Sequence, residues 1–105
     1  MNQYDIVLVN LDPTVGSEIK KTPTCVIISP NEINHNLQTL VIAPMTTTKR
    51  KYPTRVKVIH NDRIGWVVID QIRTIDKARI IKITGTLSMV EIKEIKSVIK
   101  ETYVD

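Results

Sequence analysis

The chain has 105 residues, 42% of them hydrophobic, which is enough for one compact domain with a single core, so we expect one domain over residues 1–105. Lys and Arg outnumber Asp and Glu by 15 to 11, and the resulting net charge of +4 is compatible with attraction to polyanions. A single cysteine, Cys25, excludes an intrachain disulfide, and its apolar neighbours predict a buried thiol. No basic region precedes a long apolar stretch, and no run approaches the ~18 residues of a membrane span, so we expect a soluble, cytoplasmic protein without a membrane partner.

Short apolar runs rich in β-branched residues predict strands in the first half of the chain. The first covers residues 4–11 and carries apolar side chains on both faces, so we expect it to be covered on both sides. Two more strands are expected at 25–29 and 39–44. The segment 30–36 between them is interpreted as an exposed connection.

Three further strands are expected in the second half. Residues 54–60 alternate charged and apolar side chains, as in a strand with one wet face, and 64–70 should be more uniformly buried. A tight turn at 60–63 would join them. The sixth strand is expected at 79–85, after one helical turn in 73–78 that Thr74 or Asp76 would cap.

The last segment, residues 88–104, changes to the period of an amphipathic helix. Ser88 and Glu91 form a capping box, and Leu87 is placed to staple onto Ile92. The apolar stripe consists of Val90, Ile92, Ile95, Val98, Ile99 and Thr102. Six short strands and a terminal helix predict a mainly β fold with a C-terminal α-helix, arranged as a small, strongly bent β-barrel.

Two loops carry more polar chemistry than a turn requires. The connection from Leu11 to Thr24 holds Glu18, Lys20 and Lys21, which offer a proton acceptor and two phosphate contacts. The segment 44–55 places three threonines next to Lys49, Arg50 and Lys51, and such hydroxyls and cations bind phosphate oxygens together. A solvated charged loop and ordinary turn threonines remain the alternatives.

Asp70 and Gln71 stand at the end of a buried strand, where they can read exposed base edges of single-stranded RNA. Asp70 can equally be a helix cap or an ion-pair partner. His35 and His60 lie in turn-like regions far apart in the sequence, without ligand spacing, so both are interpreted as surface histidines. We therefore expect no metal site and no cofactor.

Four segments together, IVLVNLDPTVGSE, CVIISPNEIN, VIAPMTTTKRKYPTRV and DQIRTIDKARI, resemble the MazF/PemK/Kid family of toxins from bacterial toxin–antitoxin pairs. The resemblance runs in order from about Tyr4 to Leu87. It implies a homodimeric, SH3-like β-barrel of the PemK/CcdB type that cuts single-stranded RNA at short sequences without a metal. It also implies 2′,3′-cyclic phosphate and 5′-OH products, and a cognate MazE-like antitoxin whose acidic tail would occupy the RNA groove.

The resemblance also implies site residues. Thr46 matches the family's catalytic threonine, and Glu18 matches a glutamate that supports the site. The Asp matched by Asp70 serves substrate or catalysis in some members. The candidate RNA contacts are Ser17, Lys20, Lys21, Thr47, Lys49, Arg50, Asp70 and Gln71.

One position departs from the family pattern, in which an Arg-Pro pair follows the first loop. Aligned without a gap, Pro23 stands where the catalytic Arg belongs and Thr24 where the Pro belongs. Proline has neither charge nor donor, and losing one stabiliser of transition-state charge costs on the order of 10²- to 10³-fold in rate.

Three hypotheses follow from Pro23. Lys20, Lys21 or Arg50 replaces the missing Arg in part, because a lysine supplies charge without the guanidinium fork. Alternatively, the chain is an attenuated or inactive toxin that keeps the barrel and the RNA surface. In the third, it is a non-catalytic module that binds RNA, an antitoxin or another target. The related CcdB toxin poisons gyrase, but the terminal ETYVD does not resemble that family's gyrase-binding end.

Overall fold

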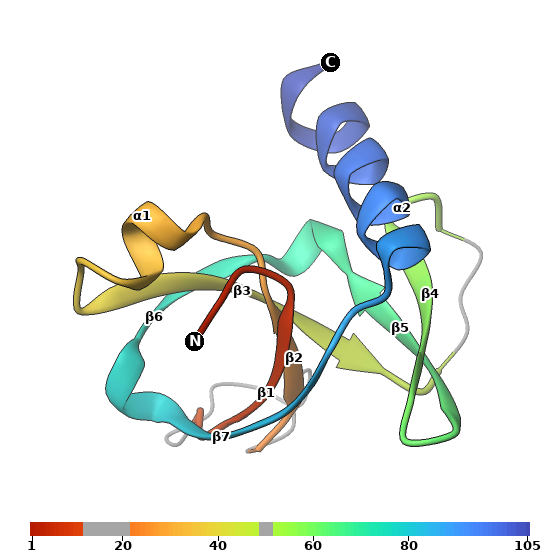
Figure 1. Cartoon of the computed structure of the whole chain (residues 1–105). Helices are drawn as coiled ribbons and strands as arrows, with labels where there is room; N and C mark the ends of the chain where they lie inside the picture. The colour runs from red at the N-terminus through yellow and green to blue at the C-terminus, as the bar shows by residue number, and fades with distance from the viewer. Residues whose placement is uncertain (12–21, 49–51) are drawn as a thin grey trace.

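The computed structural model describes residues 1–11, 22–48 and 52–105, and these form a curled antiparallel sheet with a helix packed against one end (Figure 1). The strands are β1 Asp5–Val9, β2 Thr24–Ile27, β3 Thr39–Thr46, β4 Arg55–His60, β5 Arg63–Val68, β6 Arg73–Asp76 and β7 Ile80–Thr86. The helices are α1 Asn31–Asn34 and α2 Met89–Ile99, with 3-10 turns at Ile69–Gln71 and Lys77–Arg79 and a π-helical turn at Lys100–Val104. The expected class, mainly β with a C-terminal helix, is confirmed.

The order of the strands explains how the sheet becomes a half-barrel. Along the sheet the order is β4-β5-β3-β2-β1-β7, and β6 pairs with the first half of β3. The two outermost strands, β4 and β7, are brought back together by a contact of 3.1 Å between His60 Nε2 and Thr84 Oγ1. The sheet is therefore bent until its two edges meet through side chains.

Strand β1 separates two apolar clusters and confirms that this strand is covered on both sides. Ile6 belongs to a cluster that includes Ile95 and Val98 of α2. Val7 belongs to a second cluster on the opposite face, which includes Cys25. Each face of the sheet is therefore stabilised by its own apolar burial.

Cys25 lies fully inside the second cluster, which confirms the prediction of a buried thiol. Burial raises the pKa of this thiol to about 12, and the positive charge of Arg73 offsets only part of that effect. Cys25 therefore behaves as a small apolar side chain.

The β4–β5 hairpin has the alternation and the tight turn that its sequence predicts. Val56 and Val58 are buried. Asn61 and Asp62 have φ values of 51° and 60°, as required by a two-residue turn whose twist matches the flanking strands. Residues 64–70 are less uniformly buried than expected, because Ile64 is 51% exposed.

The connection 30–36 is more ordered than predicted, because it contains the one-turn helix α1 and a buried side chain. Asn34 is buried, and its Nδ2 donates to the Ser29 carbonyl oxygen at 2.7 Å. Ser29 Oγ in turn donates to Asn34 Oδ1. This local polar network satisfies backbone groups that an exposed loop would leave to water.

The helical turn predicted within 73–78 begins later than expected, because Arg73–Asp76 forms strand β6 against Thr39–Ile42 of β3. The turn Lys77–Arg79 follows, and Asp76 Oδ1 accepts from the Ala78 N–H at 2.8 Å. Asp76 rather than Thr74 is thus the cap.

Helix α2 begins as predicted, with both hydrogen bonds of the Ser88 and Glu91 capping box in place. Leu87 and Ile92 pack in or against the same cluster, in agreement with the predicted staple. The assignment of Val90 to the buried stripe is wrong, since 78% of it is exposed. Among the residues described, no helix is long and apolar enough to cross a membrane.

Candidate functional site

The inner face of the β4–β5 hairpin changes from apolar to polar along its length. Val56 and Val58 of β4 are core residues, and the next side chain in phase with them is His60. On β5, Val67 is in the core and Arg63 lies at the same parity next to the turn, paired with His60. Polar side chains thus occupy positions that, nearer α2, are filled by valine.

Strands β1, β2 and β7 show the same change. Leu8 of β1 is paired with Thr24 on one side and with Lys82 on the other. In β7 the register skips Thr84, because Ile6 pairs with Gly85 and Val7 with Ile83. Thr84 is therefore the extra residue of a β-bulge, a device that re-aims side chains next to functional sites.

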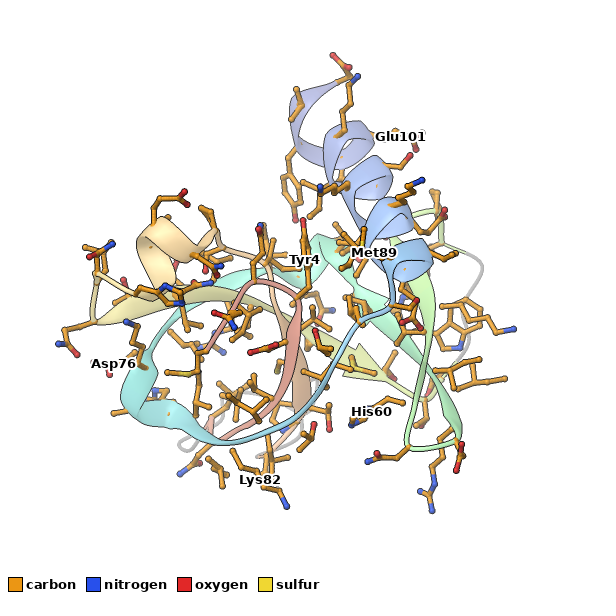
Figure 2. All side chains as sticks on the ribbon, in the orientation of Figure 1. Tyr4, His60, Asp76, Lys82, Met89 and Glu101 are labelled. Carbon is orange, nitrogen blue, oxygen red and sulfur yellow. The ribbon has the colours of Figure 1, made fainter. Side chains whose placement is uncertain are left out.

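These polar ends enclose a cavity of about 570 Å³. Figure 2 shows Lys82 at the end of the sheet remote from Met89 and helix α2, with His60 between β7 and the β4–β5 hairpin. The polar residues that line the cavity are Thr22, Thr24, Thr46, Thr47, Thr84, His60, Asn61, Arg63 and Lys82. Its remaining lining consists of Leu8, Pro23, Met45, Ile64 and Gly65.

The chemistry of this lining favours an anion. Arg63 and Lys82 carry fixed positive charge, and the threonines add hydroxyl donors. Among the lining residues in the described ranges there is neither Asp nor Glu. Hydroxyls combined with cations suit a phosphate, whose oxygens accept several hydrogen bonds at once.

Two of the predicted site residues lie in this cavity, Thr46 and Thr47. Thr46 is the last residue of β3, and its Oγ1 accepts from the Thr48 N–H at 3.2 Å. Because the oxygen acts as the acceptor in that bond, the hydroxyl hydrogen of Thr46 can still be donated to a bound group.

Pro23 also lines the cavity, just before β2 begins. It is buried, and its carbonyl oxygen accepts from the Val9 N–H at 3.1 Å. The residue therefore joins β1 to β2 through its backbone and presents an uncharged ring where a longer side chain would enter the cavity.

Asp70 and Gln71 follow the buried strand as expected, but they are not among the residues that line the cavity. Asp70 accepts from the Thr54 hydroxyl at 2.9 Å, and the N-cap of the turn Ile69–Gln71 is Val68, so Asp70 is not the cap of that turn. The other predicted contacts, Ser17, Glu18, Lys20, Lys21, Lys49 and Arg50, lie outside the described residues.

His60, Arg63 and Lys82 are among the cavity residues that were not selected from the sequence. The interpretation of His60 as a surface histidine needs correction, since its ring is half-buried and contacts Thr84. The signal that identifies it is its phase with Val56 and Val58. Within residues 1–11, 22–48 and 52–105, no group of three or more His, Cys, Asp or Glu side chains is arranged to hold a metal ion.

Comparison with known proteins identifies the family. Residues 2–103 match the family described as PemK-like, MazF-like toxin of type II toxin-antitoxin system. The chain belongs to the PemK/MazF toxin family. It is 32% identical over 94 residues to the endoribonuclease toxin MazF of Escherichia coli K12, an alignment that covers 89% of this chain and 85% of that protein. It is also 31% identical over 105 residues to the endoribonuclease MazF of Staphylococcus saprophyticus, covering 94% and 88%.

Two solved structures have the same fold. MazF from Deinococcus radiodurans matches with a TM-score of 0.84 at 19% identity, covering 100% of this chain and 97% of that one. A mycobacterial endoribonuclease, solved in complex with its cognate antitoxin, matches with a TM-score of 0.82 at 22% identity, covering 96% and 92%. These likenesses confirm the fold that the resemblance predicted.

Proposed function

We propose that this chain is a toxin of a toxin–antitoxin pair that cuts single-stranded RNA at short sequences without a metal. The ribose 2′-OH attacks the adjacent phosphate, which leaves a 2′,3′-cyclic phosphate and a free 5′-OH. The observation that carries the proposal is the position of Thr46 in a cavity lined by hydroxyls and cations. Negative charge grows on the phosphate oxygens as the new bond forms, and oriented donors lower the barrier.

Within this proposal, Thr46 contacts the phosphate in the transition state, and Glu18 transfers a proton or orders the first loop. Ser17, Lys20, Lys21, Thr47, Lys49 and Arg50 contact phosphates, and Asp70 and Gln71 contact bases or backbone. The hydroxyl hydrogen that Thr46 retains beside its bond to Thr48 supports the first role. Pro23 lowers the rate, because it places no charge in the cavity.

The proposal includes a second copy of the chain and an antitoxin as partners, all in the cytoplasm. Three isoleucines that do not line the cavity, Ile59, Ile81 and Ile83, are each more than half exposed, which favours a protein interface on β4 and β7. The cationic cavity suits the acidic segment of a MazE-like antitoxin. Sedimentation of the purified chain with and without such a segment tests both partners.

Pro23 also supports a second candidate, a non-catalytic member that binds RNA or the antitoxin. Its ring is buried at the cavity wall, so the position offers no donor to a transition state. The two candidates differ in cleavage and agree in binding.

The deciding experiment incubates the purified chain with a long single-stranded RNA in EDTA and maps the 5′ ends of the fragments. Discrete cuts that disappear in Thr46→Ala support the ribonuclease. Thr39→Ala, at the other end of the same strand, is the matched control and should cut as the unmodified protein does. Intact RNA that remains bound to the protein would contradict catalysis and favour the second candidate.

A further inference from the structure

The cavity next to Thr46 needs positive charge if it is to hold a phosphate, and Pro23 does not supply it. Among the described lining residues, the fixed cations are Arg63 and Lys82. Neither was a candidate from the sequence, and neither belongs to the two polar loops.

Arg63 and Lys82 approach the cavity from the β4–β5 hairpin and from β7, which lie at the two ends of the strand order. Arg63 is the first residue of β5, held next to His60 by the tight turn of the hairpin. Lys82 is in β7, opposite Leu8 of β1. The contact between His60 and Thr84 joins the hairpin to β7. It therefore fixes the distance between the backbone positions of Arg63 and Lys82.

Both cations are available to a ligand. Arg63 and Lys82 are exposed, although each contributes to the cavity wall. In the described part of the chain, no carboxylate lies within salt-bridge distance of either side chain. An arginine fork from the hairpin and an ammonium group from β7 offer an anion two separate cations, whereas a single arginine would offer one.

The surrounding donors favour a phosphate over a carboxylate. A carboxylate has two oxygens in one plane, whereas a phosphate diester group presents oxygens in several directions. Thr24 of β2 and Thr46 of β3 line the cavity with hydroxyl groups, whereas Thr84 of β7 also lines it but donates its hydroxyl hydrogen to the Ile6 carbonyl oxygen at 3.3 Å. The hydroxyls of Thr24 and Thr46 join the two cations as donors from different strands. A tetrahedral anion uses that distribution better than a planar one.

We propose that Arg63 and Lys82 bind the RNA phosphate beside Thr46 and supply the charge that Pro23 cannot, an inference that rests on the proposed function. The missing family arginine is then compensated in part by cations from the β4–β5 hairpin and from β7. The charge of Lys20, Lys21 or Arg50 is not required at this position.

The test measures binding of a single-stranded RNA to Arg63→Gln and Lys82→Gln as a function of salt, in a Thr46→Ala background that keeps the RNA intact. Each variant should bind about 10-fold more weakly at low salt, because one charge-assisted hydrogen bond is lost. The slope of log affinity against log salt should fall by about 0.7 per variant. Lys82→Arg, which keeps the charge, should retain most of the affinity.

Lys57→Gln is the matched control, since Lys57 is on β4 with its side chain exposed and does not line the cavity. Unchanged affinity and slope in Arg63→Gln and Lys82→Gln would overturn this inference and leave the ribonuclease proposal standing. An equal loss in Lys57→Gln would also overturn it, because net charge alone would explain the result. Loss of binding to an acidic peptide without loss of RNA binding would assign the cations to a protein partner instead. If the parent chain binds no RNA at low salt, both proposals fail.

Discussion

His60 Nε2 lies 3.1 Å from Thr84 Oγ1, and this contact joins β4 and β7, the two outermost strands of the curled sheet. The tautomer of the ring decides which partner donates. The ring also packs against Gly85, where an added Cβ would lie 3.1 Å from His60 Cε1, closer than carbon atoms normally approach. The contact therefore fixes the hairpin that carries Arg63 against the strand that carries Lys82.

Replacing Thr84 with valine removes the hydroxyl while keeping a β-branched side chain in the strand. Thr84 Oγ1 also donates to the Ile6 carbonyl oxygen at 3.3 Å, so two contacts are lost, and we expect the free energy of unfolding to fall by about 1–2 kcal/mol. RNA affinity should fall several-fold, because the spacing of Arg63 and Lys82 is no longer fixed. Both quantities can be measured by urea unfolding and by RNA titration.

Thr86→Val is the matched control for that substitution. Thr86 is in the same strand and donates to the Tyr4 carbonyl oxygen at 3.3 Å, without contacting the hairpin. It should lose stability without losing RNA affinity. If both variants bound RNA equally well, the contact with His60 would have no part in the site.

The amino-acid pattern predicts most of the fold because its signals are local. The alternation in TRVKVIH, the turn at Asn61 and Asp62, and the capping box of Ser88 and Glu91 each depend on residues a few positions apart. Strand β6 was missed because its partner is Thr39–Ile42 of β3, and the short sequence RTID is equally compatible with a turn. Pairing between distant segments decides that case.

The candidate site was predicted less completely, for a related reason. Thr46 and Thr47 follow from the resemblance, whereas Lys82 reaches the cavity only through its pairing with Leu8 and the bulge at Thr84. The register shifts a second time between Leu8 and Val9, so Lys82 lies between two irregularities of β7, and the sequence gives no local sign of either. His60 could have been predicted, because it is the next residue in phase with the buried Val56 and Val58 of the same strand.

Glu91 connects helix α2 to the hairpin. Its Oε1 accepts from the Ser88 N–H at 2.9 Å and its Oε2 from the Ile59 N–H at 2.7 Å. Glu91→Ala leaves both donors without this partner, and we expect a loss of about 1–2 kcal/mol in the free energy of unfolding. Glu94→Ala, an exposed position on the same helix, should change it by less than about 0.5 kcal/mol. Equal losses in urea unfolding would contradict a role for Glu91 beyond helix propensity.

The buried thiol of Cys25 predicts a loss of stability at high pH. Its pKa is raised from 9.0 to about 12 in the folded state, so between these values the unfolded chain loses a proton that the folded chain keeps. The unfolded state then binds fewer protons, and the free energy of unfolding falls as pH rises. From pH 8 to pH 10 this group should contribute a fall of about 1 kcal/mol.

Cys25→Ala serves as the reference for that measurement, because it retains every other titrating group. The variant should be less stable than the parent at pH 8 and should lose less stability between pH 8 and pH 10. Parallel pH profiles in urea unfolding would show that the thiol does not cause the alkaline loss. In the folded parent at pH 8, the thiol should react with a thiol reagent only as fast as the protein unfolds.

Pro23→Arg combined with Thr24→Pro restores the arrangement of the family at the wall of the cavity. The new guanidinium would start from a position that already lines the cavity with Thr46, and proline at Thr24 falls on the first residue of β2, where a strand tolerates it. If cleavage is limited by missing charge, the rate of RNA cutting should rise by about 10²- to 10³-fold. Pro23→Gln with Thr24→Pro controls for the backbone change and should give little gain.

No gain from arginine in a folded protein that binds RNA would mean that charge at residue 23 does not limit cleavage. Either Arg63 and Lys82 already supply that charge, or another part of the site is lost. Cleavage by the unmodified chain separates these two cases, since only the first leaves it an active ribonuclease.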